Sequence, residues 1–172
     1  MNETCKNLTT RRSVRKFKPD QLLETELQEV LAAGMNAPSG MNRQSAVMVV
    51  VQDPEIICKL SALNAAVMGK TDIDPFYGAP TVVVVLADTS APTWQVDGTL
   101  VLENLMNEDW GMVIGYWGSM SARQVFESEE GRKLLAQWGL SENYAGIGHC
   151  LLGYPDMEPK NLPRKSNYVI RV

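Results

Sequence analysis

Histidine and cysteine are scarce in this chain of 172 residues, which contains one His and three Cys. The cysteines, Cys5, Cys58 and Cys150, lie dozens of residues apart and form no CxxC pair. A structural zinc site needs four closely spaced ligands, so we expect no metal site. A small disulfide-stapled scaffold is also excluded, because a chain of this length buries roughly two-thirds of its unfolded surface without staples.

Long apolar runs are absent as well. No segment reaches about 18 consecutive apolar residues, the length that a membrane helix needs. Residues 1–20 also lack the apolar stretch of a signal peptide. We therefore expect a cytoplasmic protein without a membrane partner. Neither a repeat nor a Pro/Ser-rich linker interrupts the chain, and the sequence predicts one domain over residues 1–172.

The net charge of −4 gives no general attraction to nucleic acid, so we expect no such partner. The charge is, however, unevenly distributed. Residues 1–20 hold six basic side chains against two acidic ones, and residues 155–172 hold four against two. The 134 residues between them carry six basic and sixteen acidic groups. An acidic body with two basic ends indicates a local anion site.

Hydrophobic periodicity predicts helices alternating with strands. Apolar residues at helical spacing predict helices at 25–35, 54–67, 97–113, 121–127 and 129–138, with Asp97 capping the long central helix. Runs rich in β-branched residues predict strands at 46–52, 81–88, 143–155 and 167–172. This pattern indicates a layered α/β or α+β domain and leaves the strand order open.

The amino-terminal basic residues are concentrated in a segment that begins with Arg11, Arg12 and Ser13. Two adjacent guanidinium groups and a hydroxyl offer several charge-assisted hydrogen bonds to a phosphate. Alternation in an extended segment directs Arg11, Ser13 and Arg15 to one side, and Phe17 would anchor the segment in the core. A solvated basic surface is the alternative interpretation.

A polar loop, PSGMNRQ (38–44), follows the first predicted long helix. Its hydroxyl and amide groups can hydrogen-bond a polar ring edge or a polyol, and its glycine permits close backbone approach. The alternative is a helix stop followed by an ordinary turn.

Together the two segments resemble the FMN-dependent nitroreductase family. The family's Arg-Arg-Ser-x-Arg-x-Phe element is matched by residues 11–17, and its Pro-Ser-x-x-Asn-x-Gln element by residues 38–44. YGAPTVVVV (77–85) looks like the family's entry into a central strand, and residues 96–120 are similar to its long interface helix and the turn after it. GYP (153–155) with residues 163–165 looks like its closing strand and basic tail.

The resemblance implies a three-layer α+β fold with a mixed central β-sheet flanked by helices. It also implies a homodimer with a long interface helix and two FMN molecules in the interface, so that some contacts come from the second subunit. The residues implied to contact FMN are Arg11, Arg12, Ser13, Arg15, Pro38, Ser39, Asn42, Gln44, Trp117, Gly118, Arg164 and Lys165.

Within that set, Arg11, Arg12 and Ser13 are implied to hold the phosphate and ribityl end, joined by Arg164 or Lys165 from the tail. Arg15 falls where the family places a cation beside the N1/O2 edge of the flavin. A positive charge there would favour the negative charge of the reduced ring.

The implied activity is that of an FMN-dependent NAD(P)H oxidoreductase. It would pass electrons from NADH or NADPH, by a ping-pong mechanism, to a small acceptor such as a nitroaromatic, a quinone or a flavin. No catalytic side chain is implied. The short region after residue 120 leaves open an FMN-binding storage, delivery or sensor protein, and reductive dehalogenation or flavin breakdown is a third possibility without a supporting motif.

Other chemically active side chains are expected to be structural. His149 lies beside apolar residues, and Cys150 has no evident activating base. Gly146 and Gly148 open no helix after a strand, so they form no dinucleotide fingerprint. Close packing, or an approach to the flavin, explains these glycines. The polar sequence at 107–109 departs from the family and implies an exposed helix end or one near the substrate channel.

Overall fold

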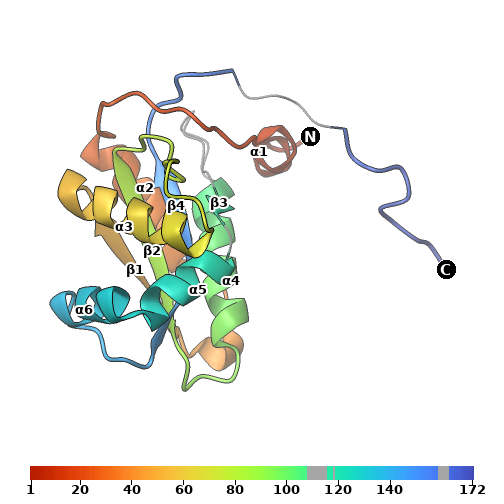
Figure 1. The fold of residues 1–172 in the computed structure, drawn as a ribbon. Coiled ribbons are helices and arrows are strands. Elements are labelled where there is room, and N and C mark those ends of the chain that lie inside the picture. The colour runs from red at the N-terminus through yellow and green to blue at the C-terminus, as the bar shows by residue number, and fades with distance from the viewer. Residues whose placement is uncertain (108–115, 118, 159–162) are drawn as a thin grey trace.

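The computed structural model describes residues 1–107, 116–117, 119–158 and 163–172 (Figure 1). Its helices are α1 (Glu3–Thr10), α2 (Glu24–Met35), the 3-10 turn η1 (Gly40–Asn42), α3 (Pro54–Val67), α4 (Trp94–Asn107), α5 (Ser119–Glu127) and α6 (Glu129–Gln137). Its strands are β1 (Ala46–Val51), β2 (Thr81–Asp88), β3 (Tyr116–Trp117) and β4 (Tyr144–Leu152). None of the described helices is long and apolar enough to cross a bilayer.

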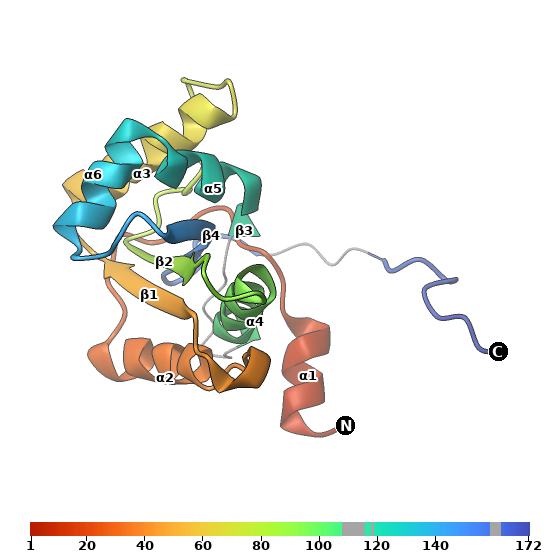
Figure 2. The same ribbon diagram turned by 90° about the horizontal axis from the view of Figure 1, so that it is seen from below.

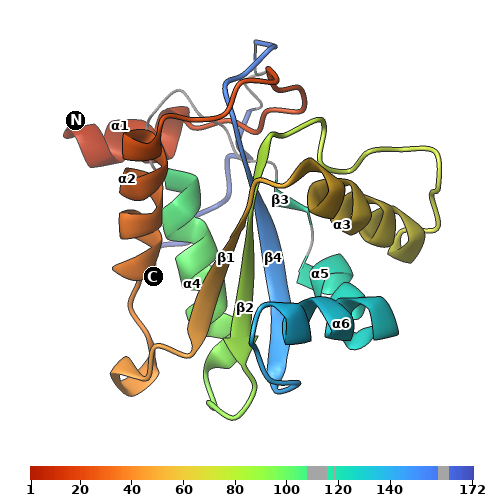
Figure 3. The same ribbon diagram turned by 90° about the vertical axis from the view of Figure 1, so that its left-hand side faces the viewer.

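The strands form one sheet in the order β1-β2-β4-β3. The predicted strand at 81–88 is confirmed, and its residues 81–87 are buried because both faces of the sheet are covered. The expected mixture of strand directions is not seen, since every pairing between described strands is antiparallel. The connection between β1 and β2, formed by α3 and the loop after it, lies near the end of the sheet where β1 ends (Figure 3). Strand β2 therefore begins at that end and runs antiparallel to β1.

Helices cover both faces of the sheet and confirm the predicted three layers (Figure 3). On one face, α2 and α4 pack their apolar side chains against the odd-numbered residues of β2: Leu102 and Leu105 lie in one cluster with Val83 and Val85. On the other face, α3, α5 and α6 pack against its even-numbered residues Val82, Val84 and Leu86. The alternation of side chains along a strand thus divides the apolar residues between two cores.

Several predicted boundaries are corrected. Helix α1 was not expected; it begins after Asn2, whose side chain accepts a hydrogen bond from the Cys5 backbone N–H. Helix α4 begins at Trp94, so Asp97 lies inside its first turn rather than at its cap. The predicted strand at 167–172 is wrong for the single chain: these residues are exposed and have no neighbouring strand, and the tail leads away from the layers (Figures 1 and 2).

Gly146 has no side chain, which lets β4 pack closely against α5. A Cβ atom at this position would lie 2.4 Å from the Ala122 carbonyl oxygen, which is closer than non-bonded atoms approach. The expectation of close packing is therefore confirmed for Gly146, and a side chain there would push α5 off the sheet.

His149 and Cys150 are both fully buried in β4. The His149 ring lies between Phe76 and Phe126, at centroid distances of 5.1 and 6.3 Å, and neither of its nitrogens has a partner among the described residues. Burial lowers the pKa of His149 to about 4 and raises that of the Cys150 thiol. Both side chains are neutral at pH 7, which agrees with the structural role expected for them.

Acid should destabilise the fold through His149. Its pKa is lowered from 6.5 to about 4 in the folded protein, so the unfolded chain binds the proton more tightly and stability falls as the pH drops through this window. The free energy of unfolding should be about 3 kcal/mol lower at pH 4 than at neutral pH through this group. Urea unfolding at pH 7 and pH 4.5 should show a smaller acid-induced loss for His149→Leu than for the wild type. Equal acid-induced losses of stability in the two proteins would contradict the lowered pKa of His149.

Candidate functional site

The amino-terminal basic segment is fixed to the chain that follows β4. The Lys18 N–H donates to the Tyr154 carbonyl at 2.8 Å, and the Asp156 N–H donates to the Lys16 carbonyl at 3.0 Å. Phe17 is buried between them and forms a β-bridge with Pro155, as its anchoring role requires. Residues 16–18 thus lie beside residues 154–156, although the two segments are far apart in the sequence.

The predicted phosphate-binding side chains differ in how free they are. Arg12 donates from Nη1 to the Thr9 carbonyl at 2.9 Å and to the Arg11 carbonyl at 2.6 Å, so it stabilises the end of α1. Arg11 is half-buried, and its guanidinium has no hydrogen bond or ion pair within the described part of the chain. Ser13 and Arg15 are exposed. This segment therefore holds a partly desolvated cation that is available to an anion.

The polar loop 38–44 adopts a conformation that side chains rarely tolerate. Met41, Asn42 and Gln44 have φ angles of 55°, 53° and 49°, each costing on the order of 1 kcal/mol. The Gln44 N–H donates to Ser39 Oγ at 3.0 Å, and Gln44 Nε2 donates to Asn42 Oδ1 at 3.1 Å. Positive φ angles are found both in tight turns and in binding loops, so this conformation agrees with both interpretations of the segment.

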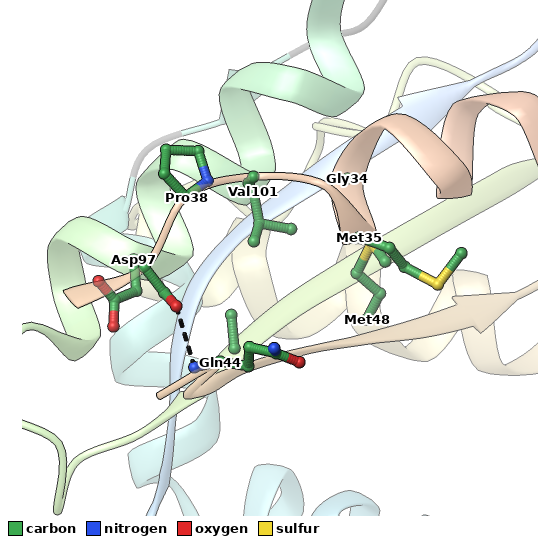
Figure 4. Close-up of a pocket in the computed structure, with 10 residues that line it drawn as sticks. Gly34, Met35, Pro38, Gln44, Met48, Asp97 and Val101 are labelled. Atoms are coloured by element: carbon green, nitrogen blue, oxygen red, sulfur yellow. Dashed lines mark hydrogen bonds between the residues drawn. The ribbon is translucent and has the colours of Figure 1, made fainter. Parts of the chain in front are cut away.

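A hollow of about 220 Å³ lies beside this loop, between α2, β1 and α4 (Figure 4). Its wall brings together three of the predicted contact residues, Pro38, Ser39 and Gln44. The remaining lining residues are Gly34, Met35, Ala37, Ala46, Met48, Asp97 and Val101. The fourth predicted residue of the loop, Asn42, is exposed and does not line the hollow. A largely apolar hollow with a few polar groups suits a flat aromatic ring with polar edges.

Asp97 is the charged group of this hollow. Its side chain is only 2 % exposed and accepts three hydrogen bonds, from the Gly40 N–H at 2.9 Å, Ser45 Oγ at 2.8 Å and Thr93 Oγ1 at 2.9 Å. The hydrogen bond from the Gly40 backbone lowers the pKa of Asp97, and those from the two hydroxyls act in the same direction against the effect of burial. Asp97 is therefore a carboxylate at neutral pH.

The two predicted motifs lie at opposite ends of the sheet. The loop 38–44 precedes Ala46, which pairs with Ala87 at one end of β2, whereas residues 16–18 adjoin the chain just after Leu152, which pairs with Thr81 at the other end. At a rise of about 3.3 Å per residue, strand 81–87 separates these ends by about 20 Å. Figures 1 and 3 show the two segments at opposite ends of the sheet. One chain thus presents the two motifs at separate places.

The other predicted contact residues are only partly placed. Trp117 lies in β3, where it pairs with His149 three residues before the end of β4. Gly118 lies outside the described residues. Arg164 and Lys165 are exposed on the tail, where the Lys165 ammonium lies 5.1 Å from the centroid of the Tyr168 ring. The structure of the single chain does not bring them to Arg11. Of the polar sequence at 107–109, only the half-buried Asn107 is described.

Sequence reasoning missed the role of Asp97. The residue was expected to cap a helix, because only its position before an apolar periodic segment was visible. Its partners Gly40 and Ser45 lie 57 and 52 positions away, and no local pattern predicts contacts at that distance.

Comparison with known proteins gives consistent results. A model of the nitroreductase family matches residues 8–117. A protein of Archaeoglobus fulgidus, whose name includes NAD(P)H nitroreductase, is 30% identical over 165 residues, covering 92% of this chain and 88% of its own.

Solved structures share the fold. A nitroreductase with bound FMN from Bacteroides fragilis has a TM-score of 0.88 and 23% identity, with both chains covered completely. A nitroreductase with bound FMN from Desulfitobacterium hafniense has a TM-score of 0.85 and 27% identity, covering 100% of this chain and 99% of its own.

Proposed function

This chain belongs to the nitroreductase family, and we propose that it is an FMN-dependent NAD(P)H oxidoreductase. The observation that carries the proposal is the strained loop 38–44, which lines a small hollow with Pro38, Ser39 and Gln44. These residues match the family's second motif. The first motif supplies the available Arg11 at the other end of the sheet.

The residues present fit FMN in two separate parts. The half-buried Arg11 guanidinium and the exposed Ser13 hydroxyl suit a phosphate, while the hollow beside loop 38–44 suits a ring with polar edges. The hollow has a volume of about 220 Å³. Typical ligand pockets have volumes of roughly 300 Å³ or more, so the hollow is smaller than these. One chain therefore holds only part of each site.

A second copy of the chain would complete the sites. We propose a homodimer in which the basic segment of one subunit and loop 38–44 of its partner contact the same cofactor. Two features of the single chain support this. The tail exposes Tyr168, Val169 and Ile170, with exposed fractions of 74%, 74% and 85%. Strand β1 is an edge of the sheet built only from Ala, Val and Met, an edge that proteins normally cover.

When bound, FMN would supply two-electron redox chemistry, the uptake of a hydride from NAD(P)H and the transfer of its electrons to an acceptor. The protein's part is to bind and orient. Arg11 and Ser13 would hold the phosphate, with Arg12, Arg164 or Lys165 adding charge, and the backbone at 117–118 would approach the ring. Arg15 would stabilise negative charge at the N1/O2 edge. Pro38, Ser39, Asn42 and Gln44 would contact the ring and exclude water.

NAD(P)H and acceptor would use the same space in turn, in a ping-pong mechanism that needs no protein nucleophile. A nitroaromatic, a quinone or a free flavin is the acceptor class that we propose. We place the reaction in the cytoplasm, because the exposed Cys5 and Cys58 are free thiols that a reducing compartment preserves.

Anaerobic stopped-flow mixing of the purified, FMN-loaded protein with NADH, and separately with NADPH, tests the activity. The account predicts loss of the flavin absorbance with at least one nucleotide, followed by its return on addition of menadione or a nitroaromatic. Parallel initial-rate patterns over both substrates would support the ping-pong order. Tightly bound FMN that neither nucleotide reduces would instead favour the storage, delivery or sensor protein.

A further inference from the structure

Among the described residues, the hydrogen bonds that join loop 38–44 to another part of the fold end on one carboxylate, that of Asp97. The loop's own hydrogen bonds, between Ser39 and Gln44 and between Gln44 and Asn42, connect only residues of the loop. The Gly40 backbone N–H, by contrast, donates to Asp97 Oδ1 on α4 at 2.9 Å. Asp97 thus links the loop to the helix layer of the core.

The surroundings of Asp97 fix the carboxylate in one orientation. Oδ2 accepts hydrogen bonds from Ser45, just before β1, and from Thr93, just before α4. Oδ1 is thereby directed at Gly40. All three donors are neutral, so the charge is stabilised by hydrogen bonds rather than by a cation, and removing the carboxylate would leave Ser45 and Gly40 without their acceptor.

The close approach of Gly40 to this network requires the absence of a side chain. A Cβ atom on Gly40 would lie 2.3 Å from Thr93 Oγ1, the hydroxyl that donates to Asp97. The glycine therefore lets the backbone reach the carboxylate, while the three residues with positive φ angles, Met41, Asn42 and Gln44, lie directly after the contact. A strained segment of this kind persists only when its surroundings hold it.

We propose that Asp97 is a positioning residue that holds loop 38–44 in the conformation required for cofactor binding. Pro38, Ser39 and Gln44 line the same hollow as Asp97, so the linkage acts where the ring would lie. The inference rests on the proposed function only for the identity of the ligand. The linkage of the loop to α4 stands independently.

The test compares Asp97→Ala and Asp97→Asn with the wild type and with Asp53→Asn as a matched control. Asp53 also accepts hydrogen bonds from backbone N–H groups, those of Glu55 and Ile56, but it caps α3 in the other helix layer. The first readout is the dissociation constant for FMN, from quenching of flavin fluorescence. The second is the rate of tryptic cleavage after Arg43, an exposed residue of the loop, in the FMN-free protein.

Asp97→Ala should raise both the dissociation constant and the cleavage rate after Arg43 by roughly tenfold or more, because it removes charge-assisted hydrogen bonds. For Asp97→Asn, the dissociation constant and the cleavage rate should lie between those of Asp97→Ala and the wild type, because the asparagine carbonyl still accepts the hydrogen bond from the Gly40 N–H. Asp53→Asn should match the wild type in both readouts.

Unchanged FMN binding in Asp97→Ala would overturn the proposal, as would faster cleavage by the same factor at every tryptic site, which indicates a general loss of stability. A wild-type protein that binds no FMN would refute the proposed function instead. In that event the cleavage rates after Arg43 would still decide whether Asp97 holds the loop.

Discussion

Replacing Arg11 with alanine is expected to raise the dissociation constant for FMN by about ten- to a hundredfold, the loss that follows removal of a charge-assisted hydrogen-bonding partner of a phosphate. Arg11 is half-buried and has no hydrogen bond or ion pair within residues that the structure describes, so its loss should leave no protein group unsatisfied. Fluorescence titration of the FMN-free protein measures the effect, and thermal unfolding without FMN should show little change.

Arg132→Ala is the matched control for this substitution. Arg132 is an exposed arginine on α6, in the helix layer opposite to α2 and α4. The control should bind FMN like the wild type. If Arg11→Ala and Arg132→Ala have equal affinities for FMN, the phosphate assignment is wrong and the basic segment is a solvated surface.

Substituting both Tyr168 and Ile170 with aspartate is expected to dissociate the homodimer. If the exposed apolar tail is buried against a second subunit, two carboxylates in that interface raise the dimer dissociation constant by about a hundredfold or more. Light scattering after gel filtration should give a mass near twice 19.0 kDa for the wild type and near 19.0 kDa for the double variant. FMN should be lost together with the partner's half of each site.

Ile73→Asp is the control for the effect of adding charge, since Ile73 is another partly exposed apolar residue, in the loop between α3 and β2. It should remain dimeric and retain FMN. A wild-type protein that is monomeric and binds FMN tightly would refute the shared site.

Local sequence patterns were sufficient for much of the fold. The β-branched runs at 46–52 and 81–88, both predicted as buried strands, do form strands, but only β2 is buried, because β1 lies at the edge of the sheet and is mostly half-buried. Asp53 with Pro54 begins α3 as expected, because helix capping depends on near neighbours. The tail at 167–172 has the composition of a strand but forms none in the single chain, because a strand needs a neighbour that local sequence cannot supply. The mixed sheet was wrong for the described strands for a similar reason: strand direction depends on where α3 packs.

Sequence motifs supplied the candidate site residues, which stay predictions, but their arrangement in the fold was not predictable. The motifs at 11–17 and 38–44 were expected to contribute to FMN sites shared between two subunits, without an expectation of where each lies in one chain, and the registers of β1 and β4 with β2 place them at opposite ends of the sheet. Only the pairing of strands reveals this. The hydrogen bond from Gly40 to Asp97 was equally invisible, because it joins a loop to a helix more than fifty positions away.

Comparing the affinities for FMN and for riboflavin shows whether the basic segment holds the phosphate, because the two ligands differ only in that group. The wild-type protein should bind FMN at least tenfold more tightly than riboflavin, and Arg11→Ala should lose most of that preference. Equal affinities of the wild type for both ligands, or a preference for FMN that survives in Arg11→Ala, would contradict the account.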